Sequence, residues 1–216
     1  MSRQSMDMEL ANVKQQLVTM GQMVNRLVLH AVEDLRTGDV DSARDAYEQD
    51  LMINDKRLQI QAHAIVMIAL QQPMGRDLRL LASVLMLTSE LERMGDYGKE
   101  IAAIGIRLGQ QWGPRCPQTL CKMAEKSTSM LTRALAAFVN DDVIAANKIY
   151  AEEDEVDHLY LDVYRQLMNT TIADARVIEG VNYLLWAAHN LERMADRVTN
   201  ICERTCFVAT GEFRVA

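Results

Sequence analysis

The residues of this chain best suited to chemistry are carboxylates within a repeated sequence. Residues 91–101 read LERMGDYGKEI and residues 191–201 read LERMADRVTNI, with six of eleven positions identical at a constant spacing of 100 residues. Each copy holds a glutamate and, four residues later, an aspartate: Glu92 and Asp96 in the first copy, Glu192 and Asp196 in the second. In a helix this spacing puts both carboxylates on one face, where they can bind a cation or form ion pairs.

A second acidic pair precedes each copy of the repeated sequence. Asp50 and Asn54 correspond to Glu153 and Asp157 at a spacing of 103 residues, again four residues apart within each pair. A short connection separates each pair's helix from the helix with the repeated sequence, so the two helices should be antiparallel neighbours. Oxygen ligands from two such helices suit Mg²⁺, Mn²⁺, Zn²⁺ or an iron ion.

The candidate metal ligands also include the residues one further helical turn along, a glutamate in the first copy and an asparagine in the second. The full set is Asp50, Asn54, Glu92, Asp96, Glu100, Glu153, Asp157, Glu192, Asp196 and Asn200. A competing interpretation needs no metal: Arg93 and Arg193 neutralise the carboxylates in a salt-bridge network. The spacing alone does not distinguish these two interpretations.

The composition favours helices almost everywhere. The 216 residues include only 3 prolines and 10 glycines but 14 methionines, with abundant leucine, alanine, glutamate and arginine. Apolar periodicity and turn residues predict six long helices, at residues 7–36, 40–70, 76–108, 118–139, 143–168 and 175–209. Asp39 and the run 140–142 should cap the second and fifth helices.

Because the repeat extends beyond the acidic residues, the chain should be an internal duplication. We expect an all-α fold of two tandem antiparallel three-helix bundles, residues 1–110 and 117–216. The glycine- and proline-containing segment 109–117 is the best candidate for the linker between them.

Several classes of function are disfavoured. A net charge of −7 without a basic run argues against binding nucleic acid. The N-terminal residues lack the apolar segment of a signal peptide and the apolar runs are too short to span a bilayer, so we expect a cytoplasmic protein with four free thiols. Di-iron carboxylate enzymes need two Glu-x-x-His pairs, and this chain has only Glu155-x-x-His158. A non-enzymatic protein is therefore favoured over the alternative, a metal-dependent helical-bundle enzyme.

The two LERM-x-D sequences, the upstream acidic pairs and the six-helix duplication together resemble the PhoU family, over essentially the whole chain. The resemblance implies a cytoplasmic, often dimeric regulator that reaches the membrane only through its partners. Those partners would be the ATPase subunit of a phosphate ABC transporter and a sensor histidine kinase. It further implies repression of the phosphate-starvation regulon when phosphate is plentiful, and metal binding through the acidic motifs.

The sequence departs from the family pattern in its first half. Asn54 stands where a second carboxylate is expected, and Glu100 stands where Asn200 stands in the second half. An amide coordinates a cation without neutralising it. We therefore expect the two sites to differ in metal affinity, chiefly because the first has Asn54 where the second has Asp157.

Overall fold

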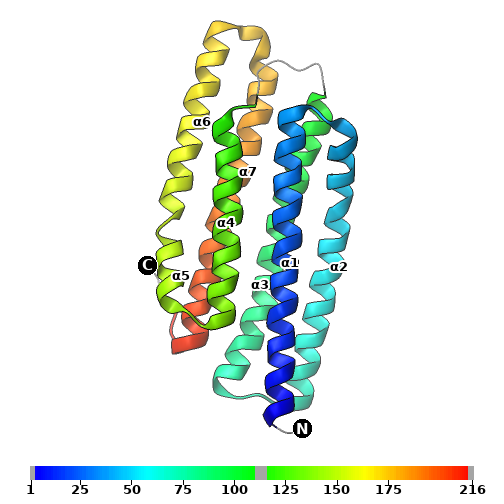
Figure 1. Ribbon diagram of the computed structural model, residues 1–216, viewed down its shortest axis with the longest axis vertical. Coiled ribbons are helices and arrows are strands. Elements are labelled where there is room, and N and C mark those ends of the chain that lie inside the picture. Colours follow the sequence, from blue (N-terminus) through cyan, green and yellow to red (C-terminus); the bar gives the residue numbers. More distant parts are fainter. Residues whose placement is uncertain (1–2, 110–115, 214–216) are drawn as a thin grey trace.

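The helices follow one another with short connections throughout the computed structural model, which describes residues 3–109 and 116–213. Their bounds are α1 Arg3–Thr37, α2 Val40–Gln71, α3 Gly75–Leu108, α4 Gln118–Asn140, α5 Val143–Tyr150, α6 Glu153–Ala173, the short 3₁₀ helix η1 Ala175–Val177, and α7 Ile178–Thr210. The expected all-helical duplication is confirmed (Figure 1). Most of the expected linker, residues 110–115, lies outside the described residues.

Equivalent aspartates start equivalent helices in the two halves. The Asp39 carboxylate accepts a hydrogen bond from the Ser42 amide at 3.0 Å, and the Asp142 carboxylate accepts one from the Ala145 amide at 2.9 Å. Each side chain satisfies a backbone amide that has no partner within the helix. The capping predicted from the sequence is therefore confirmed at both positions.

The prediction of one continuous fifth helix is wrong. The helix is interrupted at residues 151–152, which divides it into α5 and α6. At the interruption the Glu152 carboxylate is directed at α4. It accepts two hydrogen bonds from the Arg133 guanidinium, at 2.6 and 2.7 Å, and one from Lys126 at 2.6 Å. These cations hold the pKa of Glu152 down at about 2. In the first half Gln49 occupies the equivalent position, and α2 continues without a break.

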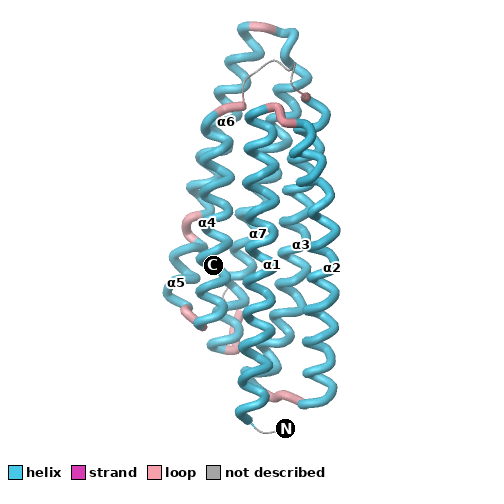
Figure 2. The backbone as a smooth tube through the Cα atoms, turned by 45° about the vertical axis from the view of Figure 1, so that its right-hand side comes forward, coloured by secondary structure: helices cyan, strands magenta, loops and turns pink. Residues whose placement is uncertain are grey.

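The two halves pack side by side through equivalent helices. Helix α1 lies against α4, and α3 lies against α7, as Figures 1 and 2 show from two directions. Leucine, valine, alanine and methionine side chains from both halves form one continuous buried core. The halves are thus one packed body, in which each half uses the same two helices as its contact surface.

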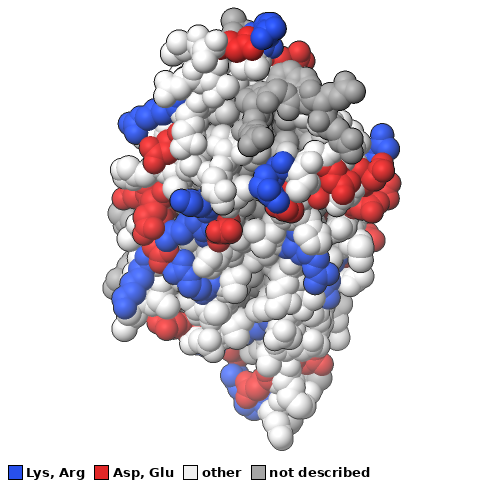
Figure 3. Space-filling view, turned by 45° about the horizontal axis from the view of Figure 1, so that its top comes forward, with Lys and Arg blue, Asp and Glu red and all other residues white. Residues whose placement is uncertain are grey.

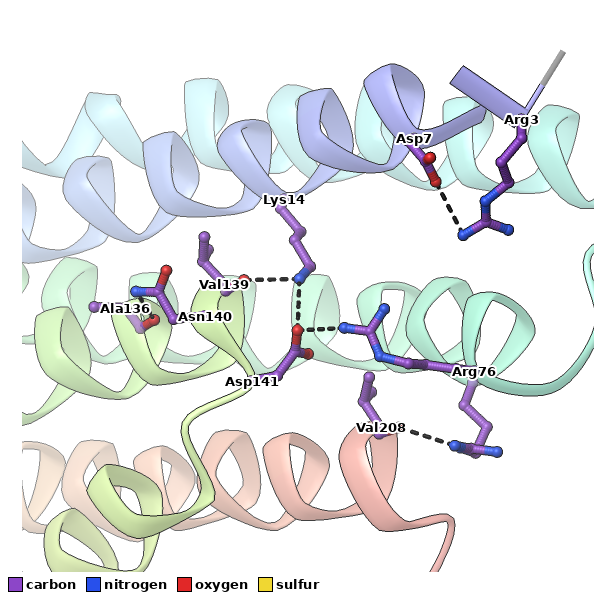
Figure 4. Close-up of polar contacts among 10 residues, drawn as sticks. Arg3, Asp7, Lys14, Arg76, Ala136, Val139, Asn140, Asp141 and Val208 are labelled. Atoms are coloured by element: carbon purple, nitrogen blue, oxygen red, sulfur yellow. Dashed lines mark hydrogen bonds and ion pairs between the residues drawn. The ribbon is translucent and has the colours of Figure 1, made fainter. Parts of the chain in front are cut away.

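Polar contacts at the edge of this interface link the two halves (Figure 4). Lys14 of α1 donates a hydrogen bond to the backbone carbonyl of Val139 at 2.7 Å, and it also pairs with Asp141 at 3.4 Å. Arg76 of α3 pairs with the same Asp141 carboxylate. Arg79 donates to the carbonyl of Val208 at 3.0 Å. These contacts satisfy carbonyls at the ends of α4 and α7 that would otherwise have no partner.

The surface carries both signs of charge. On the face shown in Figure 3, acidic and basic side chains are interspersed around the middle of the molecule, and groups of both signs also lie at its upper end and close to its narrow lower end. Within the described ranges, no helix combines the length and hydrophobicity needed to cross a membrane.

Close approach of α3 to α1 depends on Gly98, where an added Cβ would lie 2.9 Å from Leu27 Cγ and 3.1 Å from Val28 Cγ2. Because both neighbours are fully buried, we expect Gly98→Ala to lower the free energy of unfolding by about 1–2 kcal/mol. Gly105→Ala is the matched control in the same helix: its nearest neighbour would be Ala43 Cβ at 3.6 Å, an ordinary contact.

Because alanine favours helix over glycine, Gly105→Ala should be neutral or stabilising by up to about 1 kcal/mol. Thermal and urea unfolding of both variants would measure the difference. Equal stability of the two variants would contradict the packing constraint.

Candidate functional site

Helices α6 and α7 bring together the four carboxylates predicted in the second half. We name Glu153, Asp157, Glu192 and Asp196 the second acidic cluster. Burial raises the pKa of Glu153 to about 7, with further contributions from the negative charge of Asp157 and from a hydrogen bond with Asp196. This carboxyl is therefore partly protonated at neutral pH.

Other members of the second acidic cluster are affected in the same way. Burial, and then the charge of Asp196, raise the pKa of both Glu192 and Asp157. Among the described residues the one ion pair of this cluster is with His189, whose Nδ1 lies 2.9 Å from Glu192 Oε2 and which is charged only when protonated. The charge of His158 acts against the raised pKa of Asp157. The second acidic cluster thus concentrates negative charge that lysine and arginine do not neutralise.

Helices α2 and α3 form the equivalent first acidic cluster, which we define as Asp50, Glu92 and Asp96. Here an internal cation is present: Lys99 Nζ lies 2.8 Å from Asp50 Oδ2 and 5.0 Å from the centre of the Tyr47 ring. Asp50 is almost fully buried, with 1% of its surface exposed. The hydrogen bond to Asp50 raises the pKa of Lys99, so the ammonium form is stabilised.

The rest of the first acidic cluster keeps some uncompensated charge. Burial raises the pKa of Asp96, as do the charges of Glu92 and Asp50, while Arg93 and Lys99 act in the opposite direction. Arg93 is a distant partner, 4.0 Å from Asp96, with 63% of its side chain exposed. The salt-bridge interpretation based on Arg93 and Arg193 is therefore wrong about the main cation, which is Lys99.

Asn54 does not join the first acidic cluster through its side-chain oxygen, which accepts a hydrogen bond from Arg57 at 3.1 Å. Two further candidates face the other half of the molecule. Asn200 of α7 donates to Glu90 of α3 at 3.1 Å, and Glu100 lines a groove between α3 and α7. Of the ten predicted ligands, seven belong to the two acidic clusters.

Sequence reasoning missed Lys99, although comparison of the two copies of the repeated sequence shows a lysine in the first copy only. Thr199 occupies the equivalent position in the second copy of the repeated sequence, where its hydroxyl bonds the backbone carbonyl of Asp196. The two clusters therefore differ by an internal cation as well as by the expected replacement of Asp157 by Asn54.

The second acidic cluster has the chemistry of a cation site, because its donors are hard oxygens that carry excess negative charge. As the side chains stand, no three histidine, cysteine or carboxylate groups within residues 3–109 and 116–213 converge closely enough to hold a metal ion. Binding a cation would therefore require rotation of the carboxylates towards one another. Metal binding stays a prediction.

These features define a class of protein: an all-helical, internally duplicated bundle with a carboxylate cluster between the second and third helices of each repeat. The sequence model of the PhoU domain matches residues 17–104 and again residues 120–205. The chain belongs to the PhoU family.

Similar proteins share this architecture along almost their whole length. The phosphate-specific transport system accessory protein PhoU of Edwardsiella tarda is 32% identical over 204 residues, covering 94% of this chain and 84% of that protein. The crystal structure of PhoU from Pseudomonas aeruginosa matches with a TM-score of 0.88 at 30% identity, covering 95% of this chain and 99% of the other. The phosphate transport system regulatory protein PhoU from Streptococcus pneumoniae matches with a TM-score of 0.89 at 29% identity, covering 98% and 100%.

Replacing a carboxylate by its amide should change stability in opposite directions in the two clusters, because only the first acidic cluster has an internal lysine. Glu153→Gln should raise the free energy of unfolding at pH 8 by about 1 kcal/mol, because it removes a charge that the folded state disfavours. The folded-state pKa of Glu153, about 7, is above the ordinary 4.5, so the wild type loses stability as pH rises through this interval. At pH 5.5 the substitution should stabilise less than at pH 8, because only part of the interval between the ordinary and the raised pKa of Glu153 has then been crossed.

Asp50→Asn is the matched variant in the first half, and it should destabilise at both pH values by about 2–3 kcal/mol because it leaves Lys99 without its buried partner. Thermal unfolding at pH 5.5 and pH 8, with EDTA present to exclude bound metal, would measure both. A pH-independent effect of Glu153→Gln would contradict the assignment of a raised pKa.

Proposed function

We propose that this protein is a non-enzymatic accessory regulator of a phosphate-specific transport system. The observation that carries the proposal is similarity along the whole chain rather than at a motif alone. The PhoU protein of Escherichia coli (strain K12), a phosphate-specific transport system accessory protein, is 32% identical and the match covers 94% of this chain. Both repeats match the family, and both retain the carboxylates of the LERM-x-D sequence.

In this proposal the protein acts in the cytoplasm and reaches the membrane only through its partners. It couples the ATPase subunit of a phosphate ABC transporter to a sensor histidine kinase, and it represses the phosphate-starvation regulon when phosphate is plentiful. It works as a homodimer. The resemblance to the family supports these assignments, and a helical body with one continuous core suits a rigid adaptor that contacts two partners.

We further propose that a divalent or iron-type cation binds the second acidic cluster, while Lys99 takes the place of a metal in the first. The uncompensated charge around Glu153 favours a cation there, because a bound positive charge would offset the burial and the repulsion from Asp157 that raise its pKa. The ion would serve as a structural link between α6 and α7.

Mn²⁺ titration followed by electron paramagnetic resonance would test this asymmetry. We expect about one tight site per chain, because hard carboxylate oxygens bind Mn²⁺ where no internal cation competes. Glu192→Gln/Asp196→Asn should abolish that site, whereas the matched double variant Glu92→Gln/Asp96→Asn should leave it intact.

Lys99→Thr gives the first acidic cluster the residue found at the equivalent position of the second half, Thr199. Because it removes the internal cation, it should create a second Mn²⁺ site. Loss of Mn²⁺ binding in the Glu92/Asp96 double variant, or unchanged stoichiometry in Lys99→Thr, would contradict the asymmetric assignment.

The regulatory role predicts a phenotype in phosphate-rich medium. Deletion of the gene should derepress a phosphate-starvation reporter, because the repressing adaptor is missing, and the wild-type gene should restore repression. Complementation with Glu192→Ala/Asp196→Ala would report whether the second acidic cluster is needed, with folding checked by circular dichroism. An unchanged reporter in the deletion strain would refute the regulatory role.

A further inference from the structure

A groove between α3 and α7 lies where the two halves of the molecule meet. Its volume is about 390 Å³, within the usual size range of small-molecule sites, which are often found between domains. Side chains from both halves line it, including Arg107 of α3 and Arg193 of α7. The groove contains no member of the two acidic clusters, although its lining residue His189 pairs with Glu192 of the second, and nothing in the proposed regulatory function accounts for the groove.

Both arginines of the groove hold their guanidinium groups over aromatic rings. Arg107 lies over the Tyr183 ring, with 6.0 Å between its Cζ atom and the ring centre, and Arg193 lies over the Tyr97 ring at 5.1 Å. Among the described residues, neither has a carboxylate within the 4.0 Å of an ion pair, in contrast to the neighbouring Arg197, which pairs with Glu90 at 2.8 Å. Guanidinium groups held on aromatic rings keep their donors available for an anion, and phosphate oxygens match their geometry.

A buried amide also faces the groove. Asn190 lines the groove with only 5% of its surface exposed, yet its side chain makes no hydrogen bond to any described residue. Its amide atoms are not among the fully buried polar atoms that lack a partner, so they stay accessible from the groove. They can therefore bond a ligand that carries hydrogen-bonding atoms of its own.

An aromatic side chain adds a stacking surface. Trp186 lines the same groove with 60% of its surface exposed, and the edge-to-face contact with Tyr183, at 5.9 Å and 87°, holds the ring in place. Large aromatic side chains are seldom left this exposed without a contact to make, and planar bases stack on them favourably. Glu100 is the one carboxylate of the lining, and it can accept a hydrogen bond from an exocyclic amino group.

We propose that this groove binds a nucleotide. The base stacks on Trp186 and bonds the Asn190 amide and the Glu100 carboxylate, and the phosphates pair with the arginines. The phosphates then meet two guanidinium groups that are in no ion pair with a described residue, and the base meets an exposed ring face. An inorganic anion would use the arginines alone and would leave Trp186 and Asn190 unexplained, so a nucleotide fits the lining better.

Isothermal titration calorimetry of the whole protein with ATP, ADP and AMP, in EDTA to prevent binding through metal, would test the proposal. Inorganic phosphate is the comparison probe. A Trp112→Phe background leaves Trp186 as the only tryptophan, so its fluorescence should change on nucleotide addition. Arg193→Gln and Trp186→Ala should each weaken nucleotide binding by at least about tenfold, because each removes a charge-assisted bond or a stacking contact.

Arg93→Gln is the matched control, since Arg93 is the equivalent of Arg193 in the first repeat and does not line the groove. It should leave nucleotide affinity unchanged. Three results would overturn the proposal: no binding of any of the three nucleotides at millimolar concentration, equal affinity for inorganic phosphate with no effect of Trp186→Ala, or equal weakening by Arg93→Gln and Arg193→Gln.

Discussion

Carboxylates held between packed helices must be compensated, and the two halves of this protein meet that requirement differently. In the first half Lys99 reaches from α3 to Asp50 on α2, so the charge is balanced within the chain. In the second half Thr199 replaces the lysine, and burial together with the charge of Asp157 raises the pKa of Glu153 to about 7. The same scaffold thus holds one self-neutralised cluster and one that favours binding a proton or an external cation.

The fold makes this difference possible because it holds the helices rigidly. Equivalent helices meet across the interface of the halves, and their apolar side chains form a single core. Close packing at Gly98 leaves α3 little freedom to move relative to α1. A carboxylate held in this packed body can relieve repulsion by a change in its protonation or its partner.

Duplication followed by divergence also explains the groove. Its walls are α3 and α7, which carry the repeated sequence. Arg193 has an identical equivalent in Arg93, but other lining residues differ between the copies: Arg107, Trp186 and Asn190 have Phe207, Met86 and Glu90 as their equivalents. The interface of two similar halves has thus acquired an asymmetric surface. His189 lines this groove and also contacts Glu192 of the second acidic cluster, so the two features are physically adjacent.

The sequence by itself determined the helices except for the break at residues 151–152, and it determined the duplication, the caps at Asp39 and Asp142, and the family, because these follow from local periodicity and from spacing along the chain. It also identified the carboxylates at 50, 92, 96, 153, 157, 192 and 196, which share helix faces that face a neighbouring helix. Only the tertiary structure decided which carboxylates are neutralised. Whether Lys99 reaches Asp50, whether Asn54 bonds Arg57, and whether Glu152 interrupts a helix to contact Arg133 all depend on side chains from different helices. Such contacts are set by how the helices pack, which the order of residues in one helix does not specify.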